Sequence, residues 1–405
     1  MISLSRYQFR VLAILALINF VNFADRMVIV PLFPLLRADF PVRDAELGAL
    51  QTALQIVLAL GTIPFGLLAD RISRTRIIAA GVIFWSLATF LTGLAGTFAM
   101  LLLSRALVGM GEAVYGPSAQ SIISSVFPPQ TRARALAIFA AGMLIGGAGG
   151  QALGGVLGEA FGWRSAFFLV GFPGLLLGLL VMRLREPPRA PQEALVPVGR
   201  LLRVPAFLGM LLSGTLITFA GLSIVTWGAD FVQRYKGFST WEAGVLLGTL
   251  GFFSLVLGVL VGGSVADRLQ QKWVHGRVAA IAFGFAAAAP FVVWGVHAEE
   301  KATVLAAFFG AGFFMSWYHG PVTAVIHDLM PARAHATSVG VYMFVTQLAG
   351  AFGPQLVGQI SDAWGLHTGL EVAAGVLLAG AACYLLVIRC IRRDGLRHPL
   401  LDAWD

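Results

Sequence analysis

Charged residues are scarce in this chain of 405 residues, and their scarcity excludes an ordinary soluble protein. Lys, Arg, Asp and Glu together make up 12% of the sequence, whereas hydrophobic residues make up 58% and the mean hydropathy is +0.83. A soluble protein of this composition would have too few polar side chains to cover its surface. Apolar segments recur along the chain at the length of about 20 residues that a helix needs to cross a bilayer. We therefore expect an all-α polytopic membrane protein.

The sequence also lacks the patterns that most enzymes and pumps require. Its two cysteines, Cys383 and Cys390, both lie in or beside the last apolar segment, so neither a disulfide framework nor a cysteine-based metal site is expected. It has no Gly-x-x-x-x-Gly-Lys-[Ser/Thr] loop for ATP, no nucleophile elbow and no histidine-rich cluster. We therefore expect no catalytic residues, no metal and no cofactor. The first apolar segment is too long for a cleavable signal peptide, so we expect it to remain as the first span.

The apolar segments number twelve and fall into two sets of six. The proline- and arginine-rich segment 184–203 is expected to be a linker between an N-terminal bundle, 1–183, and a C-terminal bundle, 204–390, which the tail 391–405 follows. The expected spans lie near residues 9–34, 46–68, 77–95, 98–125, 133–158, 164–183, 204–230, 242–265, 277–296, 302–327, 336–360 and 368–388.

The basic residues set the expected orientation in the membrane. With the N-terminus inside, 20 of the 28 lysine and arginine residues fall in loops and tails on that side, and six fall in the opposite loops. The positive-inside rule then places both termini in the cytoplasm, with the protein in the plasma membrane, the inner membrane of a bacterium. The net charge of +8 thus reflects topology and attraction to anionic membrane lipids, and no nucleic-acid partner is expected. We expect a monomer.

Two loops at equivalent places in the two halves have similar sequences. The segment "GLLADRISRTR" at 66–76 follows the second apolar segment, and "GGSVADRLQQK" at 262–272 follows the eighth. Parallel repeats around a central pathway are typical of secondary transporters, which bind their substrate between the repeats near the middle of the membrane. The sequence therefore favours a transporter, although a receptor without transport activity stays an alternative that a flux assay would separate.

The first of these loops resembles the signature loop of the major facilitator superfamily, Gly-x-x-x-Asp-Arg-x-Gly-Arg, with Ser73 in place of the second glycine. The resemblance implies that the loop gates the cytoplasmic side, because charged side chains at helix ends interact with the termini of neighbouring helices. The matching residues are Gly66, Asp70, Arg71, Arg74 and Arg76, and Asp267 and Arg268 repeat the pattern weakly in the second half.

Other segments of the first half, including "LINFVNFADR", "RALVGMGEA" and "VFPPQTRARALAIF", resemble the Spinster-like branch of that superfamily over roughly residues 15–190. This resemblance implies proton-linked movement of a lysophospholipid or a sphingoid phosphate by alternating access. The anion:cation symporter branch, which carries sugar acids and other organic anions, shares the Asn-x-x-Asp-Arg and Arg…Gly-x-Gly-Glu patterns and is the alternative. The glycine-rich segment 142–158 partly resembles the antiporter motif of drug exporters, but Gln151 replaces its proline, so a drug exporter is less favoured.

Apart from residues in loops and near the ends of spans, four charged side chains lie inside the expected spans: Asp25, Arg26, Arg105 and Glu112. Each costs about 2.5–3.5 kcal/mol at the middle of a bilayer on insertion scales, so such residues face the protein interior and usually have partners. Asp25 and Glu112 are the only two carboxylates among them, so they are the candidate proton carriers. Arg105 is the fixed positive charge with which deprotonated Asp25 is expected to pair. The alternative is an ion-pair network that only fixes helix packing.

The substrate is expected to be a small amphipathic anion. Arg105 has the geometry to bind a phosphate or carboxylate with two hydrogen bonds, and Arg26 either shares this role or turns outward to the membrane surface. The second half has no comparable charges, so its polar and aromatic residues are expected to receive the apolar part, with a packing role as the alternative for His319. The expected substrate-binding residues are Arg105, Arg26, Asn19, Asn22, Tyr115, Thr226, Trp227, Tyr318, His319 and Gln347.

Overall fold

The computed structural model describes residues 5–186 and 196–396, except for the side chains of Ala69 and Asp70. The described residues form helices, turns and loops, with no strand among them. Within this part of the chain, ten helical stretches are long and apolar enough to cross a membrane. The two other expected spans, 302–327 and 336–360, are each built from several shorter helices in succession: three in the first and two in the second. The prediction of an all-α polytopic membrane protein is confirmed.

The helices group into two compact units, which we describe separately. Two helices contribute to both of them: α10 (Pro205–Lys236) is divided at Gly228, and α11 (Thr240–Lys272) is divided after Phe252. Unit 1 consists of residues 1–191 and 228–252, and unit 2 consists of residues 192–227 and 253–405.

The predicted boundaries of the two bundles, the linker and the tail are not tested by this grouping. Residues 187–195 of the expected linker and 397–405 of the expected tail lie outside the described part of the chain. The bundle boundaries therefore stay predictions.

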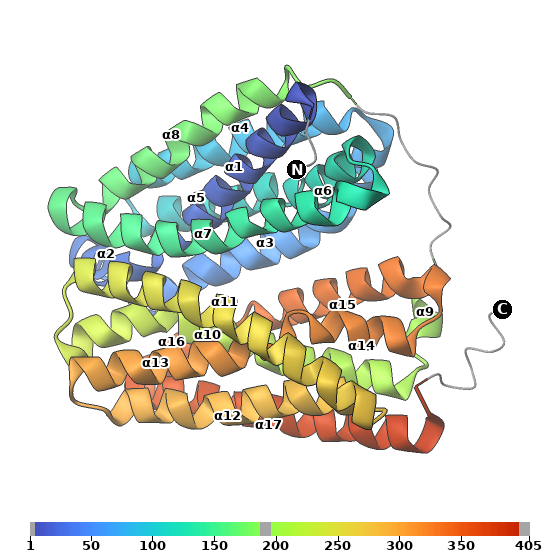
Figure 1. The fold of residues 1–405 in the computed structure, drawn as a ribbon. Coiled ribbons are helices and arrows are strands. Elements are labelled where there is room, and N and C mark those ends of the chain that lie inside the picture. Colours follow the sequence, from blue (N-terminus) through green and yellow to red (C-terminus); the bar gives the residue numbers. More distant parts are fainter. Residues whose placement is uncertain (1–4, 187–195, 397–405) are drawn as a thin grey trace. The chain divides into compact units, whose positions relative to one another are not determined.

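Unit 1 contains the first eight α-helices of the chain. Helix α1 packs against α7 and α8, α4 packs against α5 and α8, and α3 packs against α5 (Figure 1). The elements are α1 (Arg6–Val28), η1 (Val30–Leu32), α2 (Phe33–Asp39), α3 (Asp44–Arg71), α4 (Arg74–Gly93), α5 (Phe98–Glu112), α6 (Tyr115–Val126), α7 (Pro129–Phe161) and α8 (Trp163–Val181).

Glycines on α7 allow the backbone of α1 to approach it closely. A Cβ atom added to Gly146 or to Gly150 would lie 2.3 Å from the carbonyl oxygen of Phe20 or Ala24, respectively. One at Gly154 would lie 2.2 Å from the carbonyl oxygen of Val28. These glycines are four residues apart and therefore face the same side of α7. Small residues thus explain this part of the antiporter-like segment by helix packing alone.

Helix α5 is held between α3 and α4 in the same way. A Cβ atom on Gly109 would lie 2.3 Å from the carbonyl oxygen of Leu54, and one on Gly111 would lie 2.8 Å from the backbone nitrogen of Trp85. Thr97 caps the start of α5 by accepting a hydrogen bond from the backbone N–H of Met100, as residues with short polar side chains commonly do. The position of α5 against its neighbours is therefore fixed by backbone contacts.

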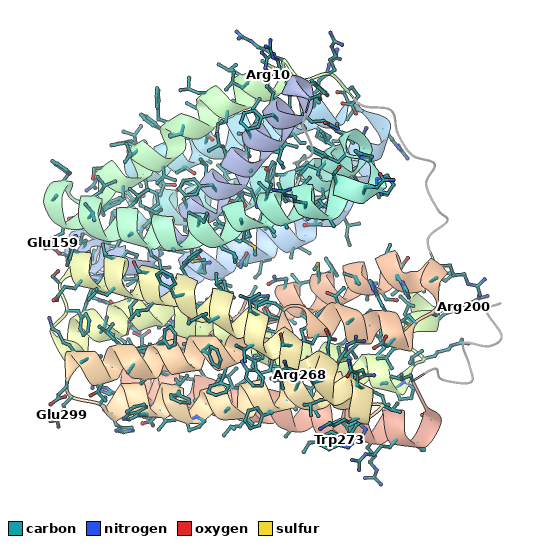
Figure 2. The ribbon with its side chains drawn as sticks, viewed as in Figure 1. Arg10, Glu159, Arg200, Arg268, Trp273 and Glu299 are labelled. Atoms are coloured by element: carbon teal, nitrogen blue, oxygen red, sulfur yellow. The ribbon has the colours of Figure 1, made fainter. Side chains whose placement is uncertain are left out.

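Unit 2 contains the other helices, together with its parts of α10 and α11. Helix α12 packs against α13 and α17, and α16 packs against α17 (Figure 1). Figure 2 shows Arg200 and Glu299 at opposite ends of this unit. Its other elements are α9 (Val198–Leu201), α12 (Gly276–His297), α13 (Lys301–Met315), η2 (Ser316–Tyr318), α14 (Pro321–Leu329), η3 (Ala332–Ala334), α15 (His335–Gly350), α16 (Gly353–Trp364) and α17 (Leu366–Asp394).

Candidate functional site

The first of two ion pairs in the interior of unit 1 joins α1 to α5. Nη1 of Arg105 donates a hydrogen bond to Oδ1 of Asp25 at 3.0 Å, and Thr89 of α4 donates to Oδ2 of the same carboxylate. The exposed fractions of the two charged side chains are 0% for Arg105 and 1% for Asp25. Three helices therefore enclose this pair completely.

The second ion pair, Arg26–Glu112, joins the same two helices, α1 and α5. Nε of Arg26 donates to Oε2 of Glu112 at 2.7 Å, and the guanidinium carbon lies 4.8 Å from the centre of the Phe23 ring. Glu112 is fully buried, whereas 15% of the Arg26 side chain is exposed. Oε1 of Glu112 has no hydrogen-bond partner among the described residues. Arg26 thus turns toward Glu112 and not outward to the membrane surface.

The two pairs are arranged crosswise. The adjacent acid and base of α1, Asp25 and Arg26, pair with the base and acid of α5, Arg105 and Glu112. The two residues of α5 are seven positions apart, which places them two turns apart on one face of the helix. Each buried charge therefore has a counter-charge within hydrogen-bond distance, which is what their burial requires.

A cavity of about 450 Å³ lies beside the second pair. Arg26 and Glu112 line it, whereas Asp25 and Arg105 do not. The four charges are thus separated into a pair at the cavity and a pair sealed from it. The lining residues are Asn19, Asn22, Phe23, Arg26, Glu112, Tyr115, Gly116, Gln120, Leu136, Phe139, Ala140 and Met143, from α1, α5, α6 and α7.

The other expected residues of the first half also line this cavity. Nδ2 of Asn19 donates to the carbonyl oxygen of Phe139 at 2.8 Å, and the hydroxyl of Tyr115 donates to the carbonyl oxygen of Leu15. Nδ2 of Asn22 is buried without a hydrogen-bond partner in the described part of the chain. Gln120 of α6 also lines the cavity, and it was not among the residues expected from the sequence because neither a charge nor a motif marks it.

The expected residues of the second half lie in unit 2. Trp227 is fully buried, and its Nε1 donates to the carbonyl oxygen of Pro354 at 2.9 Å, while Thr226 is buried beside it. The ring of Tyr318 lies 4.2 Å from that of His319, and both His319 and Gln347 are exposed in the described structure. Their binding role stays a prediction.

Arg74 in the signature loop is a buried residue that binds an acid and two hydroxyl groups. Its Nε donates to Oε1 of Glu186 at 2.9 Å, and its Nη1 donates to the hydroxyl of Ser121 at 2.8 Å and that of Ser125 at 3.3 Å. Glu186, just beyond the end of α8, had not been singled out from the sequence. The loop is therefore tied to both α6 and the end of α8.

Glu186 also binds the start of α4. Its Oε2 accepts hydrogen bonds from the backbone N–H of Thr75 at 3.0 Å and from the hydroxyl of Ser73 at 2.8 Å. Partial burial raises the pKa of Glu186, but the hydrogen bonds from Thr75, Arg74 and Ser73 outweigh it and hold the pKa at about 2. Glu186 is therefore a fixed negative charge at the N-terminus of a helix, where a negative charge is favourable.

The other loop residues differ from Arg74. Arg71 and Arg76 are exposed, and no atom lies within 4 Å of a Cβ added to Gly66. The side chain of Asp70 lies outside the described part of the chain. The gating role of these residues stays a prediction.

The equivalent loop in unit 2 has a similar bridge. Nη2 of Arg277 donates to Oδ1 of Asp267 at 2.9 Å, and its Nη1 donates to Oδ2 of Asp328 at 2.7 Å. Arg268 is exposed. Arg277 lies in the first turn of α12, just as Arg74 begins α4, so the equivalence of the two halves is the signal that points to it.

Residues 15–354 match the model of the Major Facilitator Superfamily. The chain belongs to the Major Facilitator Superfamily. An MFS-type efflux pump of Mycolicibacterium smegmatis is 29% identical, with 94% of this chain and 92% of that protein covered. The D-galactonate transporter of Escherichia coli is 25% identical, with 89% of this chain and 90% of that protein covered.

One solved structure connects this superfamily member to the Spinster-like branch. It is the crystal structure of a bacterial homologue of the human lysosomal transporter Spinster, in an inward-facing and occupied conformation. The identity is 26% and the TM-score 0.87, with 96% of this chain and 99% of that chain covered. The resemblance seen in the first half of the sequence is therefore confirmed, and the chain is a multi-pass membrane transporter.

Proposed function

We propose that this transporter moves an amphipathic organic anion and couples its movement to protons by alternating access. The observation that carries the proposal is the pair Arg26–Glu112 at the edge of the 450 Å³ cavity. An arginine keeps its proton under ordinary conditions, so Arg26 offers a permanent positive charge to an anion. Its present partner, Glu112, is a group that can exchange a proton.

Proton coupling follows from competition for one guanidinium. While Glu112 is ionised, its carboxylate occupies Nε of Arg26 at 2.7 Å. Protonation of Glu112 removes that charge and frees the guanidinium for a phosphate or carboxylate of the substrate, which can then accept two hydrogen bonds. Proton and anion therefore bind cooperatively. The coupling has the same size in both directions, because a proton that favours the anion is itself favoured by the anion.

Asp25 and Arg105 have a different part in this proposal. Both are sealed from the cavity, so Arg105 meets a substrate only after it leaves Asp25. Protonation of Asp25 would remove the charge that holds Arg105, and it would lower the free energy of a closed, dehydrated intermediate. We therefore assign to this pair a change between conformations and to Arg26 the first contact with the substrate.

The lining of the cavity supports an amphipathic substrate. Its volume falls within the range of roughly 300–1,000 Å³ that is common for small-molecule sites. Polar groups come from α1, α5 and α6, whereas the residues from α7 are Leu136, Phe139, Ala140 and Met143. An anionic head beside Arg26 with an apolar chain along α7 matches a lysophospholipid or a sphingoid phosphate.

A sugar acid is the second candidate. The similarity to the D-galactonate transporter supports it, together with the amide groups of Asn22 and Gln120 at the cavity, which suit a polyhydroxy anion. The two candidates differ in what they require of α7, because only a lipid chain gains from burial of its apolar surface there.

The experiment that tests the proposal is flux into proteoliposomes with and without a pH gradient. We expect a lysophospholipid to be accumulated in response to the gradient more strongly than D-galactonate, and we expect Arg26→Gln to abolish accumulation of either. The matched control is Arg10→Gln, which removes an exposed arginine near the start of the same helix (Figure 2). Preference for D-galactonate would favour the sugar-acid candidate, and undiminished flux in Arg26→Gln would contradict the assignment of the site.

The proposal includes a bacterial inner-membrane location with both termini cytoplasmic, and a monomer surrounded by lipids. Arg200 and Glu299 are exposed at opposite ends of unit 2 and provide a test of orientation (Figure 2). After Cys383 and Cys390 are replaced, Arg200→Cys should react with an impermeant maleimide only from the cytoplasmic side and Glu299→Cys only from the outside. The reverse labelling pattern would overturn the topology.

A further inference from the structure

Four charged side chains form a closed ring in unit 1, at the end of the helices that lies away from the start of α1. Arg37 comes from α2, Asp44 begins α3, and Asp230 and Arg234 come from α10. Arg37 donates to Asp44 at 2.6 Å and to Asp230 at 3.3 Å. Arg234 donates to Asp44 at 2.7 Å and to Asp230 at 3.1 Å. Each arginine therefore binds both aspartates; we call this set of four residues the charged clasp.

The clasp is too buried to be an ordinary surface network. The exposed fractions of its side chains are 0% for Asp230, 6% for Asp44, 27% for Arg37 and 30% for Arg234. Exposed ion pairs contribute little, whereas pairs removed from water are costly unless every charge is matched. Here two positive and two negative charges match completely.

The clasp joins segments that belong to different parts of the chain. Arg37 and Asp44 lie in the first half of the sequence, and Asp230 lies about 190 residues later, on the part of α10 that packs with unit 1. Residues 205–227 of the same helix belong to unit 2. A contact at this end of α10 can therefore hold a helix of the second half against helices of the first half.

Each side of the clasp carries one arginine and one aspartate, so the two sides can separate without leaving an unpaired charge. Arg37 and Asp44 stay together when α10 moves away, because both come from the α2–α3 region. Asp230 and Arg234 also stay together, because they are four residues apart on one helix. Within the clasp, only the two cross contacts, Arg37–Asp230 and Arg234–Asp44, are lost. The hydrogen bond that Nε2 of Gln233 donates to the carbonyl oxygen of Pro31 at 3.0 Å is lost with them.

A second contact beside the clasp has the same property. A Cβ on Gly155 of α7 would lie 2.9 Å from the Cα of Gly244 of α11, and one on Gly248 would lie 2.8 Å from the carbonyl oxygen of Ala148. The two helices thus approach each other through their backbones at these glycines, and Glu159 of α7 also accepts a hydrogen bond from the backbone N–H of Trp241 at 2.6 Å. Backbone contacts of this kind can separate and meet again without changes of rotamer at the glycines.

We propose that the charged clasp is a reversible latch, which closes the transport pathway at the end away from the N-terminus and opens once in each cycle. This inference rests on the proposed function, because alternating access requires a closure that breaks and re-forms. With the proposed topology, the latch lies on the outer side of the membrane. The matched charges give its closed state a definite register, and the two internal pairs keep the cost of opening low.

Charge-swap variants test the latch. In Arg37→Asp/Asp44→Arg and in Asp230→Arg/Arg234→Asp, each side keeps its internal pair, but both cross contacts become like-charged. The variant with all four changes restores opposite charges across the gap. A matched control is Glu299→Lys/Lys301→Glu, which exchanges two exposed charges of unit 2 and keeps the net charge.

The readout is the accessibility of a cysteine behind the clasp. Gln51 is 1% exposed and lies seven residues after Asp44, so it is on the same face of α3 and about 10 Å further along the helix. Gln51→Cys is introduced into a protein without Cys383 and Cys390, reconstituted in nanodiscs and treated with a water-soluble maleimide. A cysteine at the exposed position 46, introduced separately as Glu46→Cys, reports on the reactivity of the maleimide itself.

We expect labelling of Gln51→Cys to be about tenfold faster in each double swap than in the parent, since that factor corresponds to the loss of about one good ion pair. It should return to the parent rate in the fourfold swap and stay unchanged in the control. Equal rates in the parent and in both folded double swaps would overturn the latch. Fast labelling in the fourfold swap would also overturn it, because general loosening and not charge matching would then be the cause.

This experiment separates failure of the latch from failure of the proposed function. Labelling does not depend on the substrate, so a restored rate in the fourfold swap supports the latch even when no tested anion is transported. Conversely, pH-driven flux of a lysophospholipid with unchanged labelling would uphold the proposed function and reject the latch.

Discussion

Replacement of Glu112 by Gln gives the sharpest test of the site. The substitution keeps the size of the side chain and removes the charge that occupies Arg26, so it imitates protonated Glu112. Arg26 is left with 15% of its side chain exposed at the cavity and with its Nε free of a carboxylate. We therefore expect anion binding to become stronger while proton-driven transport is lost.

The size of the effect follows from the contact that the substrate no longer has to break. A hydrogen bond to a charged group contributes about 1.5–3 kcal/mol, and the 2.7 Å contact between Arg26 and Glu112 is of this kind. Every 1.4 kcal/mol is a factor of ten in affinity, so the dissociation constant for the anion should fall by about 10- to 100-fold at neutral pH. In the parent protein, acidification should strengthen binding in the same direction, whereas Glu112→Gln should bind independently of pH.

The assay is calorimetric titration of the purified protein with a lysophospholipid at several pH values, followed by flux in proteoliposomes. Glu46→Gln removes an exposed acid and is the control for net charge. Arg26→Gln and the double variant complete a cycle that isolates the interaction between the two side chains. Weaker binding in Glu112→Gln, or a gain that persists without Arg26, would refute the competition on which coupling depends.

Three further predictions concern other residues of unit 1. Asp25→Asn leaves Arg105 buried without its counter-charge, so it should lower the melting temperature in detergent and abolish gradient-driven flux. Arg105→Lys should impair flux because lysine cannot form the second hydrogen bond. Unchanged flux in both variants would mean that the pair only stabilises the fold. Gly150→Ala should destabilise the protein by about 1–3 kcal/mol because its Cβ would lie 2.3 Å from a backbone oxygen of α1, whereas Gly147→Ala, with its nearest neighbour at 3.8 Å, should be tolerated in the same unfolding measurement. The pKa of Glu186 is lower in the folded protein than its ordinary value of 4.5, so its contribution to the stability of the folded protein is complete above about pH 4.5 and fades as the pH falls toward 2. Glu186→Gln should therefore lower the melting temperature at pH 7, and the difference in melting temperature between variant and parent should become smaller below pH 4.

The sequence alone was sufficient for the architecture and for the choice of the charged residues. Hydropathy is a local property, and a bilayer demands apolar stretches of nearly fixed length. Ten of the twelve expected spans therefore coincide with helical stretches of the described residues that are long and apolar enough to cross a membrane. The cost of a charge in a membrane likewise identified Asp25, Arg26, Arg105 and Glu112 as residues that need partners. The motif resemblance placed the chain in the superfamily that the family model matches.

The tertiary structure decided which acid meets which base. From the sequence, Arg105 was the expected partner of Asp25, whereas Glu112 and Arg26 had no assigned partners. The close contact of α1 with α7 and of α5 with α3 and α4 fixes the rotation of both helices. That rotation gives Glu112 to Arg26 and seals Asp25 with Arg105. Helix periodicity defines faces along one helix, whereas the pairing of faces depends on crossings between residues far apart in the chain.

The same reason explains why two acids with partners in the structure were not singled out from the sequence. Asp230 lies at the end of an expected span and reads as a loop residue, yet it is fully buried by Arg37 and Arg234. Glu186 lies in a polar stretch at the start of the expected linker, yet it binds the first turn of α4. Composition and spacing show that a charge is present. Only the packing of distant helices shows whether water or another side chain surrounds it.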